Sequence, residues 1–264
     1  MSENSGRVWS NGGVLSNYRR LRAFFNFMSH KVEGFPNGLL NRMNFAKPIV
    51  DRVVFKPQEM ELIKSFVADK KDSQKWGWFI RMLVLMLETG VRISELCKMK
   101  INDVEPHSMT WSFRGKGSKL RTVRIPEYVW FMISHLIVDE RGLLRTDKEY
   151  VFHSRYWKPY NTKKFPLQRV LIEDLHSHFT TDGFRNKFYD FKKELKLNPK
   201  VSPHTCRRHF ITEMLKNTNG DIPLVAELVG HSSWDMVKLY ANSLITTKTQ
   251  TNLGLFQSQM KKVG

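Results

Sequence analysis

Hydrophobic residues recur at helical spacing over most of the chain, and this pattern predicts a mainly helical protein. Residues 15–28 carry an apolar side chain at every third or fourth position, which predicts one amphipathic helix that ends before the loop at 34–38. Residues 76–87 are almost continuously apolar, so we expect a buried central helix there. Further helices are predicted over 57–66, 127–138 and 183–195, the last with an inward stripe of phenylalanines.

Apolar and polar residues alternate in two neighbouring stretches, 109–114 and 120–125. This alternation is typical of half-buried strands, and the Gly-Lys-Gly-Ser sequence between the stretches supplies a turn. We therefore predict a small antiparallel β-sheet in an otherwise helical domain. Residues 150–164 are aromatic and basic, and we expect either an exposed loop or a packed irregular connector.

Residues 201–242 read as three short helices with clear start and stop signals. Ser202 followed by proline is a helix start, and Asp221 caps the second helix, which Gly230 can end in a left-handed conformation. Ser233 can cap the last helix. These helices would bring His204, Arg207, His231 and Tyr240 near one another, because residues three apart share a helix face and the two turns are short.

Charge indicates the class of partner. The 264 residues contain 43 Lys and Arg against 25 Asp and Glu, a formal net charge of +18. Such a composition suits a polyanion, and nucleic acid is favoured over a membrane, although a solvated basic surface or a binder without sequence preference gives the same composition. The amino terminus has no signal-peptide core, and the longest apolar run, 129–138, is too short to span a bilayer. Two cysteines, Cys97 and Cys206, form no metal-binding or disulfide pattern.

Order and spacing add what single residues cannot. A His-x-x-Arg pair is usually a polar surface pair, and a tyrosine at the end of an amphipathic helix is usually a core residue. Here, however, residues 88–96 read Glu-Thr-Gly-Val-Arg-Ile-Ser-Glu-Leu, and they precede a lysine on a hairpin, His204-x-x-Arg207, Gly230-His231 and Tyr240. This series strongly resembles the tyrosine recombinase (phage integrase) family. The resemblance implies the catalytic-domain fold of DNA breaking-rejoining enzymes, mainly α with a small antiparallel sheet.

The resemblance also implies roles for six residues. Tyr240 would attack the scissile phosphate and form a 3′-phosphotyrosyl intermediate, His204 would assist its deprotonation, and Lys116 would protonate the departing 5′ oxygen. The residues that would stabilise the charged phosphate are Arg92, Arg207 and His231. Glu95 would orient Arg92. We expect further DNA contacts from five basic residues: Arg114, Lys119, Arg121, Arg185 and Arg208. Lys119 is the alternative to Lys116 as the hairpin lysine.

No metal and no cofactor are expected, since the intermediate keeps the bond energy and the sequence has no two-metal carboxylate cluster. The implied partners are double-stranded DNA with paired recombination sites and, normally, four protomers, with accessory DNA-bending proteins. The expected location is cytoplasmic, at the nucleoid of a bacterial, archaeal or phage host.

Three regions are predicted: residues 1–50 as an N-terminal arm and remnant of a helical core-binding domain, 51–245 as the catalytic domain, and 246–264 as a tail that could dock on a neighbouring protomer. The expected function is site-specific recombination: integration, excision, resolution or transposition of a mobile element. The alternatives are a type IB topoisomerase or telomere-resolvase activity on the same residues, or a catalytically silent, integrase-derived DNA-binding protein.

Overall fold

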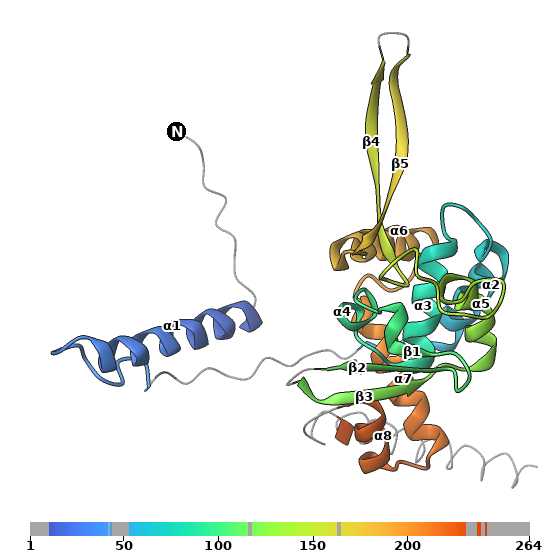
Figure 1. Cartoon of the computed structure of the whole chain (residues 1–264). Helices are drawn as coiled ribbons and strands as arrows, with labels where there is room; N and C mark the ends of the chain where they lie inside the picture. The colour runs from blue at the N-terminus through green and yellow to red at the C-terminus, as the bar shows by residue number, and fades with distance from the viewer. Residues whose placement is uncertain are drawn as a thin grey trace, which may run out of the picture. The chain divides into compact units, whose positions relative to one another are not determined.

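A computed structural model describes residues 11–41, 43, 53–115, 118–162, 165–230, 237–238 and 241, with the backbone alone at 11–12, 155–162 and 165–171. The chain divides into two compact units, Met1–Arg52 and Val53–Gly264. The elements are labelled in Figure 1. In chain order they are α1 Asn11–Lys31, α2 Pro57–Lys70, α3 Gly77–Thr89, α4 Ile93–Leu96, η1 Ile101–Asp103, β1 Val104–Glu105, β2 Thr110–Arg114, β3 Leu120–Arg124, α5 Glu127–Ile137, β4 His153–Thr162, β5 Phe165–His178, α6 Thr181–Glu194, α7 Pro203–Asn217 and α8 Ile222–Val229.

The first unit consists mainly of α1, the amphipathic helix predicted from its apolar spacing. The hydroxyl of Tyr18 donates a hydrogen bond to the carbonyl of Leu40, which fastens the following loop to the helix. Phe24 and Phe27 remain 55% and 57% exposed. None of the residues described in this unit is buried, so the helix keeps apolar surface that the unit itself does not cover.

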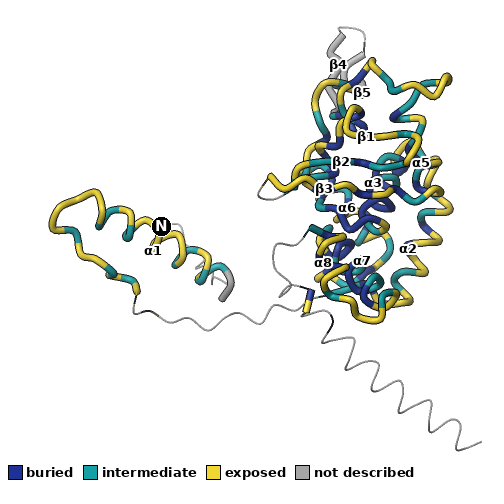
Figure 2. The backbone as a smooth tube through the Cα atoms, turned by 60° about the horizontal axis from the view of Figure 1, so that its bottom comes forward, coloured by how far each residue is buried: buried dark blue, intermediate teal, exposed yellow. Residues whose placement is uncertain are grey.

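The core of the second unit is built around α3. This helix is apolar on all sides, the pattern of a helix enclosed by others, and it packs against α2, α5 and α7. Phe79 of α3 contacts the phenylalanine stripe of α6, with ring centroids 5.0 Å from Phe184 and 5.3 Å from Phe191. Buried residues concentrate along α3 and α7 in Figure 2. The predictions of a buried central helix and of an inward stripe on α6 are confirmed.

The predicted hairpin is also present. Strands β1, β2 and β3 form one antiparallel sheet in that order. Trp111 and Val123 are directly opposite each other and both face the core. Because side chains alternate across a strand, the intervening polar residues lie on the other face.

The prediction for residues 150–164 was wrong. Instead of a loop, residues 153–162 form β4, which pairs with β5 in a long antiparallel hairpin. Pro159 lies within β4, opposite Arg169. Proline cannot donate to a strand ladder and therefore argues against a strand in the sequence, yet a two-stranded hairpin consists only of edge strands, where it is tolerated.

The helix starts around the candidate site agree closely with the sequence. Asp221 caps α8, its Oδ1 accepting a hydrogen bond of 2.9 Å from the amide of Leu224. Helix α7 begins at Pro203, as expected. Helix α6 begins at Thr181, two residues before its predicted start, and Thr180 caps it by accepting a 3.0 Å bond from the amide of Gly183. The cap predicted at Ser233 lies outside the described residues.

Candidate active site

Two helices that lead into the candidate site end at glycines with a left-handed backbone. Helix α3 ends at Gly90 (φ 62°) and α8 ends at Gly230 (φ 63°). Glycine adopts this conformation without the steric cost of a Cβ atom. At Gly90 an added Cβ would also lie 2.3 Å from Cδ1 of Phe210, and at Gly230 it would lie 3.1 Å from Cδ of Arg121. Both turns therefore depend on glycine.

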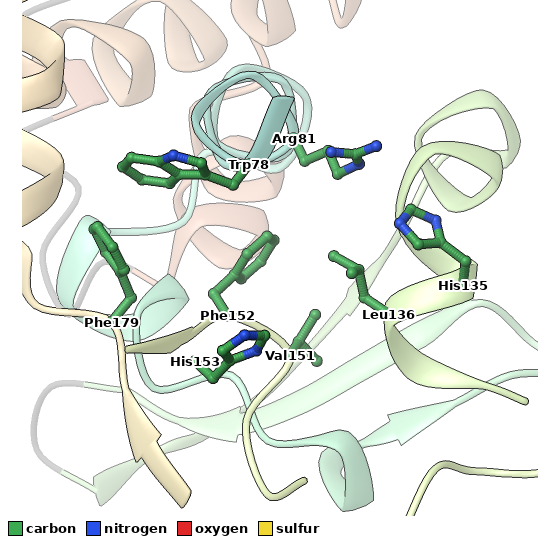
Figure 3. Close-up of a pocket in the computed structure, with 8 residues that line it drawn as sticks. All are labelled: Trp78, Arg81, His135, Leu136, Val151, Phe152, His153 and Phe179. Atoms are coloured by element: carbon green, nitrogen blue, oxygen red, sulfur yellow. The ribbon is translucent and has the colours of Figure 1, made fainter. Parts of the chain in front are cut away.

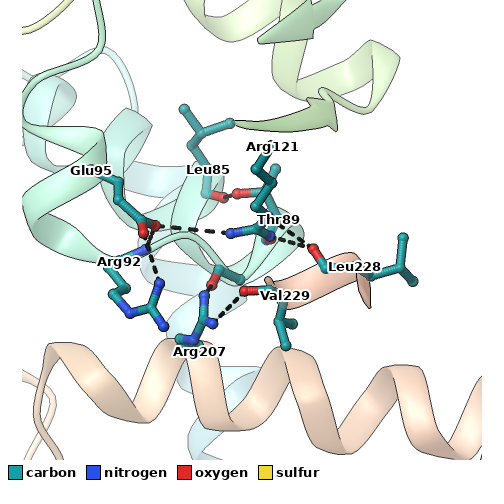
Figure 4. Close-up of polar contacts among 9 residues, drawn as sticks. Leu85, Thr89, Arg92, Glu95, Arg121, Arg207, Leu228 and Val229 are labelled. Atoms are coloured by element: carbon teal, nitrogen blue, oxygen red, sulfur yellow. Dashed lines mark hydrogen bonds and ion pairs between the residues drawn. The ribbon is translucent and has the colours of Figure 1, made fainter. Parts of the chain in front are cut away.

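Arg207, on α7, joins these two helix ends (Figure 4). Its Nη1 donates to the carbonyl of Gly90 and its Nη2 to the carbonyl of Val229, each at 2.5 Å. The residue is only 5% exposed. The predicted phosphate-binding arginine is thus held in a fixed orientation by main-chain carbonyls of two different helices.

Arg121, on β3, joins the same two helix ends by bonding the carbonyls directly before those that Arg207 bonds. Its Nη2 donates to the carbonyls of Leu228 at 2.5 Å and Thr89 at 3.2 Å, and its Nε donates to Leu228 at 3.0 Å. The residue is 9% exposed. This placement does not favour the predicted role of Arg121 as a DNA contact, because its Nε and Nη2 are bonded to carbonyls and its Nη1 is buried. Burial lowers the pKa of Arg121 to about 10, so it remains charged at neutral pH.

Arg92 stands at the turn between α3 and α4, paired with Glu95. The Glu95 carboxylate accepts bonds from the Arg92 amide at 2.8 Å and from its Nη1 at 2.7 Å. The Arg92 side chain is 24% exposed, whereas that of Glu95 is 9% exposed. A carboxylate at the third position of a helix satisfies the amide at the helix start. Glu95 thereby holds Arg92 with part of its guanidinium facing solvent, in the orienting role expected of it.

His204 lies one turn before Arg207 on α7, exposed at the helix surface. Surrounding protein atoms lower its pKa below the ordinary value, and the positive charges of Arg208, Arg207, Arg185 and Arg92 lower it further. The positive charges that act on this imidazole come from the turn before α4 and from helices α6 and α7. The lowered pKa favours the neutral ring, which can accept a proton near neutral pH.

The other described basic residues of the predicted site are accessible. Arg114 is exposed, with a 3.0 Å bond from Nη1 to the carbonyl of Ser118, and Lys119 is exposed beside it. Arg185 is 55% exposed along its side chain and paired with an aspartate one turn away. Arg208 is half-buried next to Arg207. All of these positions are compatible with contacts to a phosphate backbone.

Three predicted catalytic residues, Lys116, His231 and Tyr240, lie outside the described residues. The residues directly before Lys116 and His231 in the chain, Gly115 and Gly230, are the last ones that the structure describes there. Gly115 directly follows Arg114, the last residue of β2, and Gly230 follows the carbonyls bonded by the two buried arginines.

A groove of about 720 Å³ runs beside Arg92 between α4 and the β2–β3 hairpin. It is lined by residues of both signs, including Arg92, Glu95, Lys98, Lys100 and Arg114. Sequence reasoning missed the two lysines. Buried and exposed residues alternate over Cys97, Lys98, Met99 and Lys100. The sequence already carries the matching alternation of apolar and basic residues, which indicates that the two lysines face the same side. Lys100 forms an ion pair of 2.7 Å with Glu149.

A second, smaller cavity of about 120 Å³ shares no lining residue with that groove (Figure 3). Trp78, His135 and Phe179 are among the side chains around it. His153, at the start of β4, lies on its wall, with its Nε2 3.3 Å from a carboxylate oxygen of Glu173. This cavity lies at the base of the β4–β5 hairpin, and Arg92, Arg121 and Arg207 are not among its lining residues.

Other site classes find little support in the part of the chain that the structure describes. That part contains no cluster of three or more His, Cys, Asp or Glu able to hold a metal ion. Cys97 and Cys206 are free and buried, and burial raises the pKa of each thiol to about 12, so neither forms a thiolate. Among the described residues, no helix is both long and apolar enough to cross a membrane.

Solved structures of recombinases share this fold. The XerH site-specific recombinase bound to a palindromic difH substrate superposes with a TM-score of 0.68 at 17% identity, covering 94% of this chain and 68% of that one. The Tn1549 transposon integrase in complex with transposon right end DNA gives 0.62 at 18% identity, covering 88% and 75%. The predicted fold, mainly helical with small antiparallel sheets, is confirmed.

Sequence comparisons extend the likeness beyond the fold. The chain is 28% identical over 244 residues to the tyrosine recombinase XerC of Anoxybacillus flavithermus, covering 92% of this chain and 75% of the relative. It is 30% identical over 161 residues to a XerC of Salmonella typhi, covering 61% and 47%. The model of the phage integrase family matches residues 54–246. The chain therefore belongs to the phage integrase family of DNA breaking-rejoining enzymes, as its motifs predicted.

Proposed function

We propose that the protein is a site-specific DNA recombinase that cuts and rejoins strands through a covalent 3′-phosphotyrosyl intermediate. The observation that carries this proposal is that Arg207 bonds the carbonyl of Gly90, two residues before Arg92, so the two predicted phosphate-binding arginines meet at one helix end although they are more than 100 residues apart in the chain (Figure 4). Two permanently charged guanidiniums are suited to a phosphate that gains negative charge in the transition state. The XerC relatives, named tyrosine recombinases, support the same activity.

The reaction divides into two transfers of the same phosphoryl group. In the first, the Tyr240 oxygen forms a bond to phosphorus as the bond to the 5′ oxygen breaks. His204 takes the phenolic proton, and Lys116 gives a proton to the departing oxygen. In the second transfer, a 5′ hydroxyl of the partner strand attacks the phosphotyrosine and releases Tyr240. One phosphoester is exchanged for another at each step, so the chemistry itself requires no nucleotide hydrolysis.

Charge stabilisation falls to the remaining residues. Arg92 and Arg207 would bind the non-bridging oxygens, with His231 as a further hydrogen-bond donor. Arg92 is suited to this because part of its side chain is accessible. Arg207 is suited because its two carbonyl bonds fix the plane of the guanidinium before substrate arrives. Such preorganisation avoids rearrangement during the reaction.

We assign duplex binding to the groove beside Arg92 and to the exposed basic residues near it. Lys98 and Arg114 line the groove, and Lys119 follows on the hairpin. Arg185 and Arg208 would extend the contacts across α6 and α7. These residues would bind phosphates, giving affinity without sequence preference.

For the whole assembly we propose paired recombination sites and four protomers, as an exchange between two duplexes requires, with DNA-bending accessory proteins and action at the nucleoid. Residues 51–245 would form the catalytic domain. Residues 1–50 would be part of a core-binding domain, and 246–264 a tail that docks on a neighbouring protomer. The exposed apolar side chains of α1 suit a helix that packs against further protein or DNA.

The test is covalent capture on nicked suicide duplexes drawn from DNA that flanks the gene. The wild-type protein should form a protein–DNA adduct that survives denaturing electrophoresis, and Tyr240→Phe should form none while still binding DNA. Adducts that survive the Tyr240→Phe change would contradict the proposed nucleophile. Binding without any adduct on the whole set of duplexes would favour the silent DNA-binding protein.

Strand-exchange and plasmid-relaxation assays separate the near alternative. A topoisomerase or telomere resolvase would use the same residues on a single duplex. Strand exchange between two duplexes of different length yields a recombinant of predictable size, whereas relaxation of a supercoiled plasmid alone would indicate the topoisomerase activity.

A further inference from the structure

Consecutive carbonyls at the ends of two helices are bound by two arginines. Arg121 takes the carbonyl of Thr89 from α3 and that of Leu228 from α8, and Arg207 takes the next carbonyl of each helix end. The last carbonyls of a helix lack partners within the helix and lie at the negative end of its dipole. Two buried cations therefore satisfy both ends at once and hold them together, as Figure 4 shows.

Arg121 also has a third connection. Its Nη1 lies 3.9 Å from Oε2 of Glu95, the carboxylate that holds Arg92. This nitrogen is buried and makes no hydrogen bond in the structure. Its guanidinium carbon is 5.6 Å from the ring centroid of Phe113 on the neighbouring strand, so the guanidinium has little freedom to move away.

We propose that Arg121 is a positioning residue for the two phosphate-binding arginines: through the carbonyls of α3 and α8 and the carboxylate of Glu95, it sets where Arg92 and Arg207 stand relative to each other. This inference rests on the proposed function, since it assigns Arg121 a part in that same site without contact to DNA. Arg121 acts on Arg92 through Glu95, and on Arg207 through the two helix ends that both arginines bind.

The geometry requires an arginine here. A guanidinium has donors on three nitrogens in a fixed plane, so Arg121 bonds the two helix ends through Nη2 and Nε while Nη1 faces Glu95. A lysine has one ammonium nitrogen on a flexible stem, so Arg121→Lys would keep the charge but could not replace the contacts of all three nitrogens. Arg124→Lys is the matched control, because Arg124 lies on the same strand and is exposed.

The first measurement is amide hydrogen exchange of the protein without DNA. In Arg121→Lys, exchange should rise together in peptides ending α3 (residues 86–92) and α8 (224–230), by about tenfold or more, since buried charge-assisted bonds are lost at both ends. Exchange in the middle of α3 should not change, which shows that the variant is folded. Unchanged exchange at either helix end would overturn the proposed connection, whether or not the protein cleaves DNA.

The second measurement is the single-turnover rate of adduct formation at saturating DNA, with DNA affinity determined in parallel. Arg121→Lys should slow adduct formation by about ten- to a hundredfold, because displaced reacting groups cost rate rather than binding. Affinity and its salt dependence should stay near wild type, and Arg124→Lys should match wild type in both.

The remaining outcomes contradict the proposal in distinguishable ways. Weaker binding with a smaller salt dependence, at an unchanged saturated rate, would make Arg121 a DNA contact. A normal saturated rate with normal binding would make it a stabilising residue only. If wild-type protein forms no adduct on any duplex, the proposed function fails, while the exchange measurement still decides whether Arg121 couples the two helix ends.

Discussion

At the scale of the residue, the guanidinium of Arg207 has to satisfy both structure and chemistry. It is buried and bonded to the carbonyls of Gly90 and Val229, yet it is also assigned to the scissile phosphate. The spacing of His204 and Arg207 predicted that they share one helix face, but it held no information on burial. Arg121 shows the same limit. An arginine on a predicted hairpin next to basic residues resembles a DNA contact, and only the tertiary fold places the ends of α3 and α8 around it.

Arg207→Lys should therefore lower the rate of adduct formation by about a hundred- to a thousandfold, the usual cost of removing one donor to a developing oxyanion. A lysine keeps the positive charge but cannot bond two carbonyls and a phosphate in one plane. DNA affinity should change little. Single-turnover assays at saturating DNA measure the effect, with Arg141→Lys as the control, because Arg141 is an exposed arginine that pairs with Asp139. A rate within about threefold of wild type would contradict the proposed binding of the scissile phosphate by Arg207.

The pH dependence of cleavage tests His204. If the neutral ring accepts the phenolic proton, activity is present above its pKa and is lost as pH falls through it. Surrounding protein atoms and neighbouring arginines lower that pKa, so the acid limb of kcat/KM should lie below the ordinary histidine value of about 6.5. Arg208→Gln removes the neighbouring positive charge that lowers the pKa of His204 most, so it should move the acid limb toward higher pH. An acid limb above that value, or one that persists in His204→Gln, would exclude His204 as the proton acceptor.

At the scale of the element, helix boundaries were predictable where they depend on local chemistry. The caps at Ser202 and Asp221 and the glycine stops follow from hydrogen bonds and backbone angles within a few residues. The β4–β5 hairpin was not predictable, since pairing over 153–178 depends on two stretches finding each other and Pro159 argues against a strand. Local signals fix where a helix begins or ends, and non-local pairing leaves a weaker trace in the sequence.

Gly90→Ala tests the turn that carries Arg92. An alanine would be strained at φ 62°, and its Cβ would clash with Phe210. Gly142→Ala is the matched control, because Gly142 has φ 78° but nothing within 4 Å of an added Cβ. The control should lose about 1–2 kcal/mol from backbone strain, and Gly90→Ala should lose a further 1–3 kcal/mol or so from overpacking. Urea unfolding measures both, and equal losses would show that Phe210 moves aside freely.

At the scale of the whole molecule, the net charge of +18 does not show which basic residues contact the duplex. Composition predicted a polyanionic partner, but it could not say which basic residues face that partner. The groove beside Arg92 indicates which basic residues face the duplex, because Lys98 lines this groove together with Arg92 of the candidate site. Lys64, by contrast, lies on α2 in an ion pair of 2.7 Å with Glu61.

Lys98→Ala should consequently weaken DNA binding and reduce the slope of log K against log salt concentration by about 0.9, the contribution of one phosphate contact on duplex DNA. Because phosphate contacts carry no sequence information, the loss should be the same on specific and unrelated duplexes. Lys64→Ala removes an equal charge and should leave the slope unchanged, which separates a local contact from the field of the whole protein. Titrations at several salt concentrations measure both slopes. An equal reduction in the two variants would mean that net charge, rather than the groove, determines DNA affinity.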